Sequence, residues 1–111
     1  MNDYTPDRWV VVNFDNAGER FNKLLVEWKG GYLHGDSWRM NSGITAVTED
    51  AEYYAFSGAS GSIYHCAKGR YGVTGEAANI LHMILERNSD TVRIHALPED
   101  TDWNSIEMVN L

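Results

Sequence analysis

The stretch RWVVVNF, residues 8–14, predicts a β-strand, because it is rich in β-branched and aromatic residues whose alternate members share a face. Residues 15–18, DNAG, then form a turn, since Asn and Gly tolerate a positive φ. Residues 20–28, RFNKLLVEW, are the return strand, so this part of the chain is a β-hairpin. The residues that share a face are Val10, Val12 and Phe14 on the first strand and Leu24, Val26 and Trp28 on the second.

A second hairpin lies beyond a glycine-rich interruption. Residues 52–57 and 62–66 are aromatic and β-branched, and the sequence GASG at 58–61 joins them. Residues 44–49 alternate weakly and predict another strand before this hairpin. Three glycines among residues 30–37 argue against regular structure there, so we expect an irregular connection between the two hairpins.

Residues 74–87 predict an amphipathic helix. With Ala77 as the reference and about 100° per residue, the apolar side chains gather on one face. Thr74 suits the N-cap position. Arg87 and Asn88 suit the C-terminal end, the first by its charge and the second by its tolerance of the left-handed conformation. The apolar face consists of Ala77, Ile80, Leu81, Ile84 and Leu85.

This order of elements predicts a single α+β domain over residues 1–111. Short hairpins force antiparallel neighbours, so we expect a mostly antiparallel sheet of five to six strands with one amphipathic helix packed on one face. The last strand, residues 91–97, would turn Val92, Ile94 and Ala96 inward. The other face needs cover from aromatic side chains, the acidic tail or a second copy of the chain, which makes a homodimer or higher oligomer one expected solution.

Composition narrows the classes of function. A formal net charge of −7, from nine Lys and Arg against sixteen Asp and Glu, disfavours general nucleic-acid binding but is compatible with a small nucleotide in a local pocket. A mimic of DNA would need carboxylates in dense rows, whereas here they are scattered. The apolar runs are too short to cross a bilayer, and the first residues lack a secretory signal. The single cysteine, Cys66, suits a reducing cytoplasm.

The sequence contains no complete set of residues for catalysis or for metal binding. We therefore expect that the protein is not an enzyme and binds no metal and no cofactor. His65 and Cys66 are neighbours on a predicted strand and therefore point to opposite faces, which keeps His65 from activating the thiol. Cys66 is better explained as a small buried hydrophobe. His34 and Asp36 lie in a loop, but no His-x-x-x-His or Cys-x-x-Cys pair accompanies them.

The polar segment around Trp38 is the strongest candidate for binding. Tyr32, Trp38, Arg39 and Asn41 combine planar rings, a guanidinium and an amide, which suit stacking on a base and gripping a phosphate or carboxylate. The same groups form the hot spots of protein interfaces. The alternative is an irregular connection with Trp38 pinned in the core.

Two further segments are suited to anions. In the turn at residues 57–62, successive backbone amides could form an anion-binding nest to which Ser60 and Ser62 add hydroxyls. A plain hairpin turn is the alternative. Residues 68–72 place Arg70 and Tyr71 just before the helix, whose N-terminus attracts anions. A solvated loop is the alternative for this segment.

One resemblance rests on DRWVV at 7–11, GGY at 30–32, DSWRMNSG at 36–43, and the aromatic and glycine pattern of residues 53–66 that leads to Tyr71. In these stretches the chain resembles a group of small uncharacterised proteins encoded by tailed bacteriophages. The resemblance covers about residues 7–75. It implies no activity but a setting, the cytoplasm of an infected bacterium, where small accessory proteins act by binding host components.

We therefore expect a non-enzymatic phage accessory protein that inhibits a host defence or host process by binding. Its target is either a small anionic, nucleotide-like ligand or a host protein gripped through exposed aromatic residues and the acidic surface. One alternative is a small hydrolase or transferase that uses His34, Asp36 or His65, and another is an oligomeric virion component. The residues expected to bind the ligand are Tyr32, Trp38, Arg39, Asn41, Ser60, Ser62, Arg70 and Tyr71.

Overall fold

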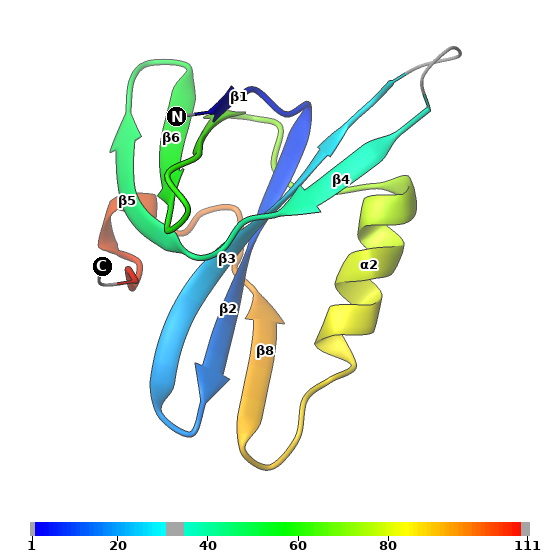
Figure 1. Cartoon of the computed structure of the whole chain (residues 1–111), viewed down its shortest axis with the longest axis vertical. Coiled ribbons are helices and arrows are strands. Elements are labelled where there is room, and N and C mark those ends of the chain that lie inside the picture. The colour runs from blue at the N-terminus through cyan, green and yellow to red at the C-terminus, as the bar shows by residue number, and fades with distance from the viewer. Residues whose placement is uncertain (1, 31–34, 110–111) are drawn as a thin grey trace.

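The computed structural model describes residues 2–30 and 35–109 and has an α+β architecture (Figure 1). In this part of the chain, eight strands form two four-stranded sheets, and an α-helix and a 3₁₀ helix accompany them. The elements are β1 (Asp3–Tyr4), β2 (Arg8–Asn16), β3 (Glu19–Trp28), β4 (Ser37–Met40), β5 (Ile44–Glu49), β6 (Tyr53–Gly58), β7 (Ile63–Ala67), α2 (Gly75–Leu85), β8 (Val92–Ala96) and η1 (Trp103–Ser105).

The division into two sheets corrects the prediction of one sheet with five to six strands. The small sheet has the order β1-β7-β6-β5, and the long sheet has the order β4-β3-β2-β8. Both predicted hairpins are present, as β2–β3 and β6–β7. Mostly antiparallel pairing is confirmed, since among the described strands β1 and β7 alone pair in parallel.

β2 is the centre of the fold because both of its faces are buried. Val10 and Val12 pack under the helix, whereas Trp9 and Val11 pack against the small sheet. A strand that is buried on both faces needs a continuous apolar run rather than alternation. The run Val10–Val12 supplies it, and the result is three layers, with the long sheet between the helix and the small sheet (Figure 1).

The apolar part of the long-sheet face opposite the helix is covered from within the chain. The small sheet lies over it, and so does η1, whose Trp103 is 2% exposed. The ring centroids of Trp103 and Trp9 are 5.4 Å apart, and Tyr54, Phe56 and Tyr71 extend the same aromatic cluster. A second copy of the chain is therefore not needed to cover this apolar part.

α2 confirms the predicted helix and begins and ends within two residues of the predicted bounds. Ala77 is buried, and the predicted apolar face packs on the long sheet. The ends differ from expectation. Thr74 makes no side-chain capping bond, and Asn88 has no positive φ but donates from Nδ2 to the carbonyl of Leu85 at 2.6 Å. No helix among the described residues is long and apolar enough to cross a membrane.

In the turn between β2 and β3, an alanine, Ala17, adopts the left-handed backbone conformation. Asn16 and Glu19 are the last paired residues, so the loop consists of Ala17 and Gly18. Their φ angles are 54° and 92°, and positive φ at both positions is the type I′ geometry that suits the twist of a hairpin. The predicted turn is confirmed, but Ala17 rather than Asn16 adopts the strained conformation.

Two short strands lie outside the prediction. β1 adds to the edge of the small sheet, where Tyr4 pairs with Tyr64. β4 adds to the edge of the long sheet, where Trp38 pairs with Glu27. β4 therefore continues the first hairpin into a third strand, in a region that the glycines had suggested to be irregular.

Candidate functional site

The structure does not gather the predicted site residues into one place. Tyr32 lies outside the described residues. Trp38 and Arg39 are neighbours on β4 and therefore point to opposite faces of the long sheet. Trp38 is 41% exposed, so the alternative in which it anchors the segment in the core is wrong.

Arg39 is already engaged within the chain. Its guanidinium lies over the ring of Tyr4, 4.7 Å from the centroid, and its Nη1 donates to the Tyr4 hydroxyl at 2.6 Å. The hydrogen bond that Arg39 donates to Tyr4 is the main reason why the pKa of Arg39 is raised. The contact fixes β1 against β4 and leaves Arg39 less available to a ligand.

Asn41 supports the backbone instead of facing a ligand. The residue is 6% exposed, and its Oδ1 accepts from the amide of Leu24 at 2.8 Å and from the amide of Gly43 at 3.3 Å. These bonds hold the end of β4 and the turn into β5.

The backbone amides of the serine turn, residues 57–62, donate hydrogen bonds within the chain. The N–H groups of Gly58 and Gly61 donate to carbonyls of the same turn, and that of Ala59 donates to the carbonyl of Gly43. The amide of Ser60 donates to the hydroxyl of Ser42 at 2.9 Å. With these four amides occupied, the turn that carries Ser60 and Ser62 has the hydrogen bonding of a hairpin turn rather than of an open anion nest.

Tyr71 is a core residue with a polar tip. Its hydroxyl donates to the carbonyl of Leu97 at 2.5 Å and accepts from the amide of Val11 at 3.1 Å. Burial raises the pKa of Tyr71 to about 12. The side chain thus ties β2 to the segment after β8.

Arg70 lines a cavity that we call the arginine cavity. Its volume is about 640 Å³, within the range of small-molecule sites. Arg8 and Lys29 also line it, so three of the nine Lys and Arg residues face one space. The remaining lining residues are Thr5, Pro6, Asp7, Tyr53, Ala67 and Thr74.

The backbone brings Arg8 and Arg70 together. Trp9 and Tyr71 form a parallel bridge, and the amide of Trp9 donates to the carbonyl of Arg70 at 3.4 Å. Within residues 2–30 and 35–109, neither arginine lies within ion-pair distance of a carboxylate.

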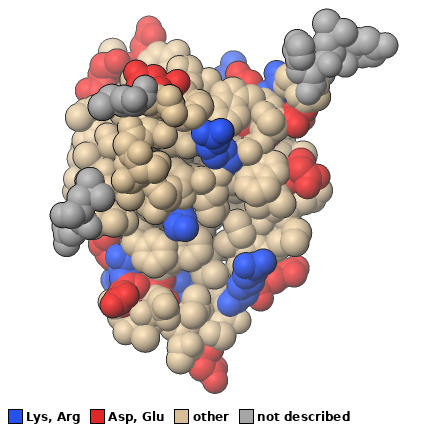
Figure 2. Space-filling model, in the orientation of Figure 1, with Lys and Arg blue, Asp and Glu red and all other residues tan. Residues whose placement is uncertain are grey.

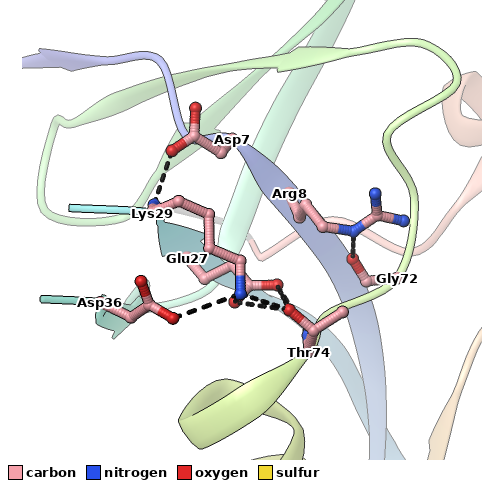
Figure 3. A network of polar contacts seen from close by, with 7 residues as sticks. All are labelled: Asp7, Arg8, Glu27, Lys29, Asp36, Gly72 and Thr74. Carbon is pink, nitrogen blue, oxygen red and sulfur yellow. Dashed lines mark hydrogen bonds and ion pairs between the residues drawn. The ribbon is translucent and has the colours of Figure 1, made fainter. Parts of the chain in front are cut away.

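Arg8 is held in a defined direction. Its Nε donates to the carbonyl of Gly72 at 2.8 Å (Figure 3). Its Nη2 donates to the carbonyl of Tyr71 at 2.7 Å. Neutral carbonyl partners orient the guanidinium but leave its charge uncompensated. Arg8 was not among the predicted site residues, because its position at the start of a strand gave no sign of what would lie beside it.

The carboxylate of Glu27, on β3, is buried against the start of α2, beside the arginine cavity (Figure 3). The Glu27 side chain is 2% exposed, and its Oε1 accepts from the amide of Thr74 at 2.7 Å. Lys29 Nζ lies 3.3 Å from both Glu27 Oε2 and Asp36 Oδ2. Desolvation lowers the pKa of Lys29, but its hydrogen bonds to Glu27 and Asp36 and the attraction of these two carboxylates outweigh it and leave the pKa raised.

This network changes the expected role of the helix end. The sequence suggested that the N-terminus of α2 attracts an external anion, whereas Glu27 supplies an internal one. Because Lys29 is shared between Glu27 and Asp36, the cations of the cavity without an ion-pair partner among the described residues are Arg8 and Arg70, and Asp7 adds a carboxylate to the same lining.

Outside the arginine cavity, the groups considered for catalysis and metal binding stay apart. Cys66 is buried and desolvation raises the pKa of its thiol well above the ordinary value. His65 lies on the opposite face of β7, 3.6 Å from Asp3. Among the described residues, no three His, Cys, Asp or Glu side chains gather in a way that could hold a metal ion. His34 lies outside the described residues.

The acidic side chains are spread over the surface. Figure 2 shows them in separate groups on the face that it presents, with basic side chains between them and no continuous row. On this face the arrangement differs from the dense rows that a mimic of DNA would need.

Comparison of the chain with protein-family models, with curated proteins and with solved structures found no match.

Proposed function

We propose that this protein is a non-enzymatic binding protein that sequesters a small anionic, nucleotide-like ligand in the arginine cavity. The observation that carries the proposal is the pairing of Arg8 and Arg70 in one cavity without a carboxylate partner among the described residues. The chain has a net charge of −7, so a cavity with two arginines that lack an ion-pair partner differs from the acidic average of the chain.

The chemistry of the cavity favours a phosphate or carboxylate. Two like charges side by side repel each other, and a bound anion removes that repulsion. A guanidinium also presents a planar fork of donors that matches these anions. Pro6, Tyr53 and Ala67 add apolar wall, and the ring of Tyr53 offers a surface on which a base can stack.

The setting implied by the resemblance to phage proteins suggests what sequestration achieves. A protein made in an infected bacterium that binds a signalling nucleotide lowers its free concentration and so inhibits the host process that depends on it. This role needs no catalytic group, and it rests on affinity and abundance alone.

A thermal-shift screen tests the proposal, with cyclic dinucleotides, ADP-ribose derivatives and mononucleotides as the panel. A ligand at 100 times its Kd adds about 2.7 kcal/mol to the free energy of unfolding, so a true ligand raises the melting temperature clearly. Arg70→Gln should abolish the shift, whereas Arg87→Gln at the end of α2, outside the arginine cavity, should keep it. A panel without any shift contradicts the nucleotide-like class.

A second candidate function, binding of a host protein, is favoured by the exposure of Trp38. Trp38 at 41% and Met83 at 56% are the exposed large hydrophobic side chains of the described chain, and tryptophan is enriched in interface hot spots. A partner that is captured from infected cells by the wild type and by Met83→Ala, but not by Trp38→Ala, supports this function. Equal capture by the wild type, Met83→Ala and Trp38→Ala contradicts this second function.

A further inference from the structure

One face of the long sheet changes character along its length. On β2, Trp9 and Val11 face the small sheet and are buried by it, but the next residues on that face are Asn13 and Asp15. Figure 1 shows that the lower part of β2, β3 and β8 extends beyond the small sheet. The polar residues therefore begin where the cover of the small sheet ends.

This uncovered part of the sheet holds a second cavity, which we call the asparagine cavity. Its volume is about 480 Å³, and it shares no lining residue with the arginine cavity. The two cavities lie toward opposite ends of β2, since Arg8 begins the strand and Asp15 lies next to its last residue. The lining residues are Asn13, Asp15, Arg20, Arg93, His95, Leu97 and Glu107.

Two buried amides form the floor of the asparagine cavity. Asn13 is 8% exposed and Asn22 is 1% exposed. Asn13 Nδ2 donates to Asn22 Oδ1 at 3.0 Å, and Asn22 Nδ2 donates to the carbonyl of Glu107 at 2.9 Å. Burying polar groups costs free energy unless they are bonded, and these bonds offset most of that cost.

One polar atom of these two amides has no hydrogen-bond partner among the described residues. The Asn13 side chain lines the cavity, and its Oδ1 accepts no hydrogen bond from any residue in the described ranges. Asn13 is 8% exposed, its Oδ1 reaches the solvent of the cavity, and the bond from Nδ2 fixes the direction of this oxygen. Such an acceptor is suited to a donor that a ligand brings.

The walls of the asparagine cavity carry both signs of charge, since Asp15 on β2 pairs across the sheet with Arg20 on β3 and with Arg93 on β8. Arg20 lies between Asp15 and Glu107, with distances of 3.1 Å to Asp15 Oδ2 and 3.5 Å to Glu107 Oε1. Arg93 and His95 come from β8, and the side chains of both make no polar contact with another described residue. The β8 side therefore offers a cation, and the β2 and tail side offers carboxylate and amide oxygens.

We propose that the asparagine cavity binds a small zwitterion of the size of an amino acid or dipeptide. The Arg93 guanidinium binds the carboxylate of the ligand, and the oxygens of Asn13 and Glu107 accept from its ammonium group. A volume of about 480 Å³ suits a molecule of this size. The proposal is independent of the arginine cavity, because the two sites share no residue.

NMR titration of the ¹⁵N-labelled full chain with the common amino acids and with dipeptides of glycine tests this site. We expect shift changes at the amides of Asn13, Asp15 and Arg93 that saturate by about 10 mM for at least one probe. Arg93→Gln should weaken binding by about tenfold or more, and Arg70→Gln should leave it unchanged. The absence of saturating shifts in the wild type, or equal binding by Arg93→Gln, overturns the proposal.

Modified probes test the zwitterion itself without a change to the protein. The N-acetylated form of the bound probe lacks the ammonium charge, and the C-amidated form lacks the carboxylate. Each should bind about tenfold more weakly or worse if both ends are recognised. Undiminished binding of either form shows that the ligand class is wrong, even where the cavity itself is occupied.

Discussion

Glu27 on β3 accepts a hydrogen bond from the backbone amide of Thr74 at 2.7 Å, so a buried carboxylate of the long sheet closes the start of α2. This contact adds a polar link between the long sheet and the helix to the apolar packing of α2. It lies beside the arginine cavity, because Lys29, the residue after β3, lines that cavity and reaches Glu27 and Asp36.

Glu27→Leu should therefore destabilise the protein although the residue lies in an otherwise apolar layer. The amide and hydroxyl of Thr74 lose their partner, and the loss of hydrogen bonds to a charged group costs about 1.5–3 kcal/mol in the free energy of unfolding. Urea denaturation measures the change. The exposed Glu76→Gln, in the first turn of α2, is the matched control and should shift stability by only a few tenths of a kcal/mol. Equal stability of Glu27→Leu and the wild type contradicts the role of Glu27.

Ala17→Asn should stabilise the protein. Ala17 holds a φ of 54°, a conformation that Asn adopts at lower cost in a type I′ turn. We expect a gain of about 0.5–1 kcal/mol in the free energy of unfolding. Ala17→Val serves as the opposite control and should lose stability, because a β-branched residue resists this conformation. Thermal denaturation of the three proteins measures their order of stability. If Ala17→Val is the most stable and Ala17→Asn the least stable, the assigned turn is wrong.

Asn88→Ala should open the outer edge of β8. The Asn88 amide occupies that edge as a strand would, since it donates to the carbonyl of Ile94 at 3.0 Å and accepts from its amide at 2.7 Å. An uncovered edge pairs readily with another chain. Size-exclusion chromatography with light scattering should show self-association of Asn88→Ala, while Asn79→Ala, exposed on α2, stays like the wild type. An Asn88→Ala protein that does not self-associate at any concentration argues that other features protect the edge.

Stability should fall at alkaline pH through Tyr71. Burial raises the pKa of Tyr71 to about 12 from an ordinary value of 10.0. Because the folded pKa exceeds the unfolded one, this contribution is fully present below about pH 10 and is lost as the pH rises through about 12. Tyr71→Phe removes the titration, so its free energy of unfolding should change less between about pH 9 and about pH 12.

The same variant has a cost at neutral pH that checks the structural account. Without the hydroxyl, the amide of Val11 and the carbonyl of Leu97 lose a shared partner, for which we expect about 1–3 kcal/mol. Burial also raises the pKa of Tyr64, so the Tyr71→Phe variant keeps part of the alkaline response of the wild type. An identical pH dependence in the two proteins contradicts the assignment to Tyr71.

The sequence predicts the local elements well because each has a pattern of its own. The shared face of Leu24, Val26 and Trp28 and the helical period around Ala77 are both present in the structure. The division into two sheets has no such local sign. It depends on Val10–Val12 being buried on both faces and on β4, whose four residues follow a glycine-rich segment.

The candidate site was predicted only in part, for a reason that lies in the topology. Arg70 stood out as a cation before the helix, and it does line the arginine cavity. Arg8 joins it through the parallel bridge between Trp9 and Tyr71, two residues far apart in the sequence. Asn41 and Tyr71 have the polar groups of a site, yet their partners are backbone groups of the chain itself.

Calorimetric titration with inorganic pyrophosphate tests the central claim, an anion site built by Arg8 and Arg70, most directly. We predict saturable binding to the wild type below about 10 mM and a loss of about tenfold or more in affinity for Arg70→Gln. Arg93→Gln, in the asparagine cavity, should bind pyrophosphate as the wild type does. No heat of binding in the wild type, or equal affinity of wild type and Arg70→Gln, would contradict the anion site.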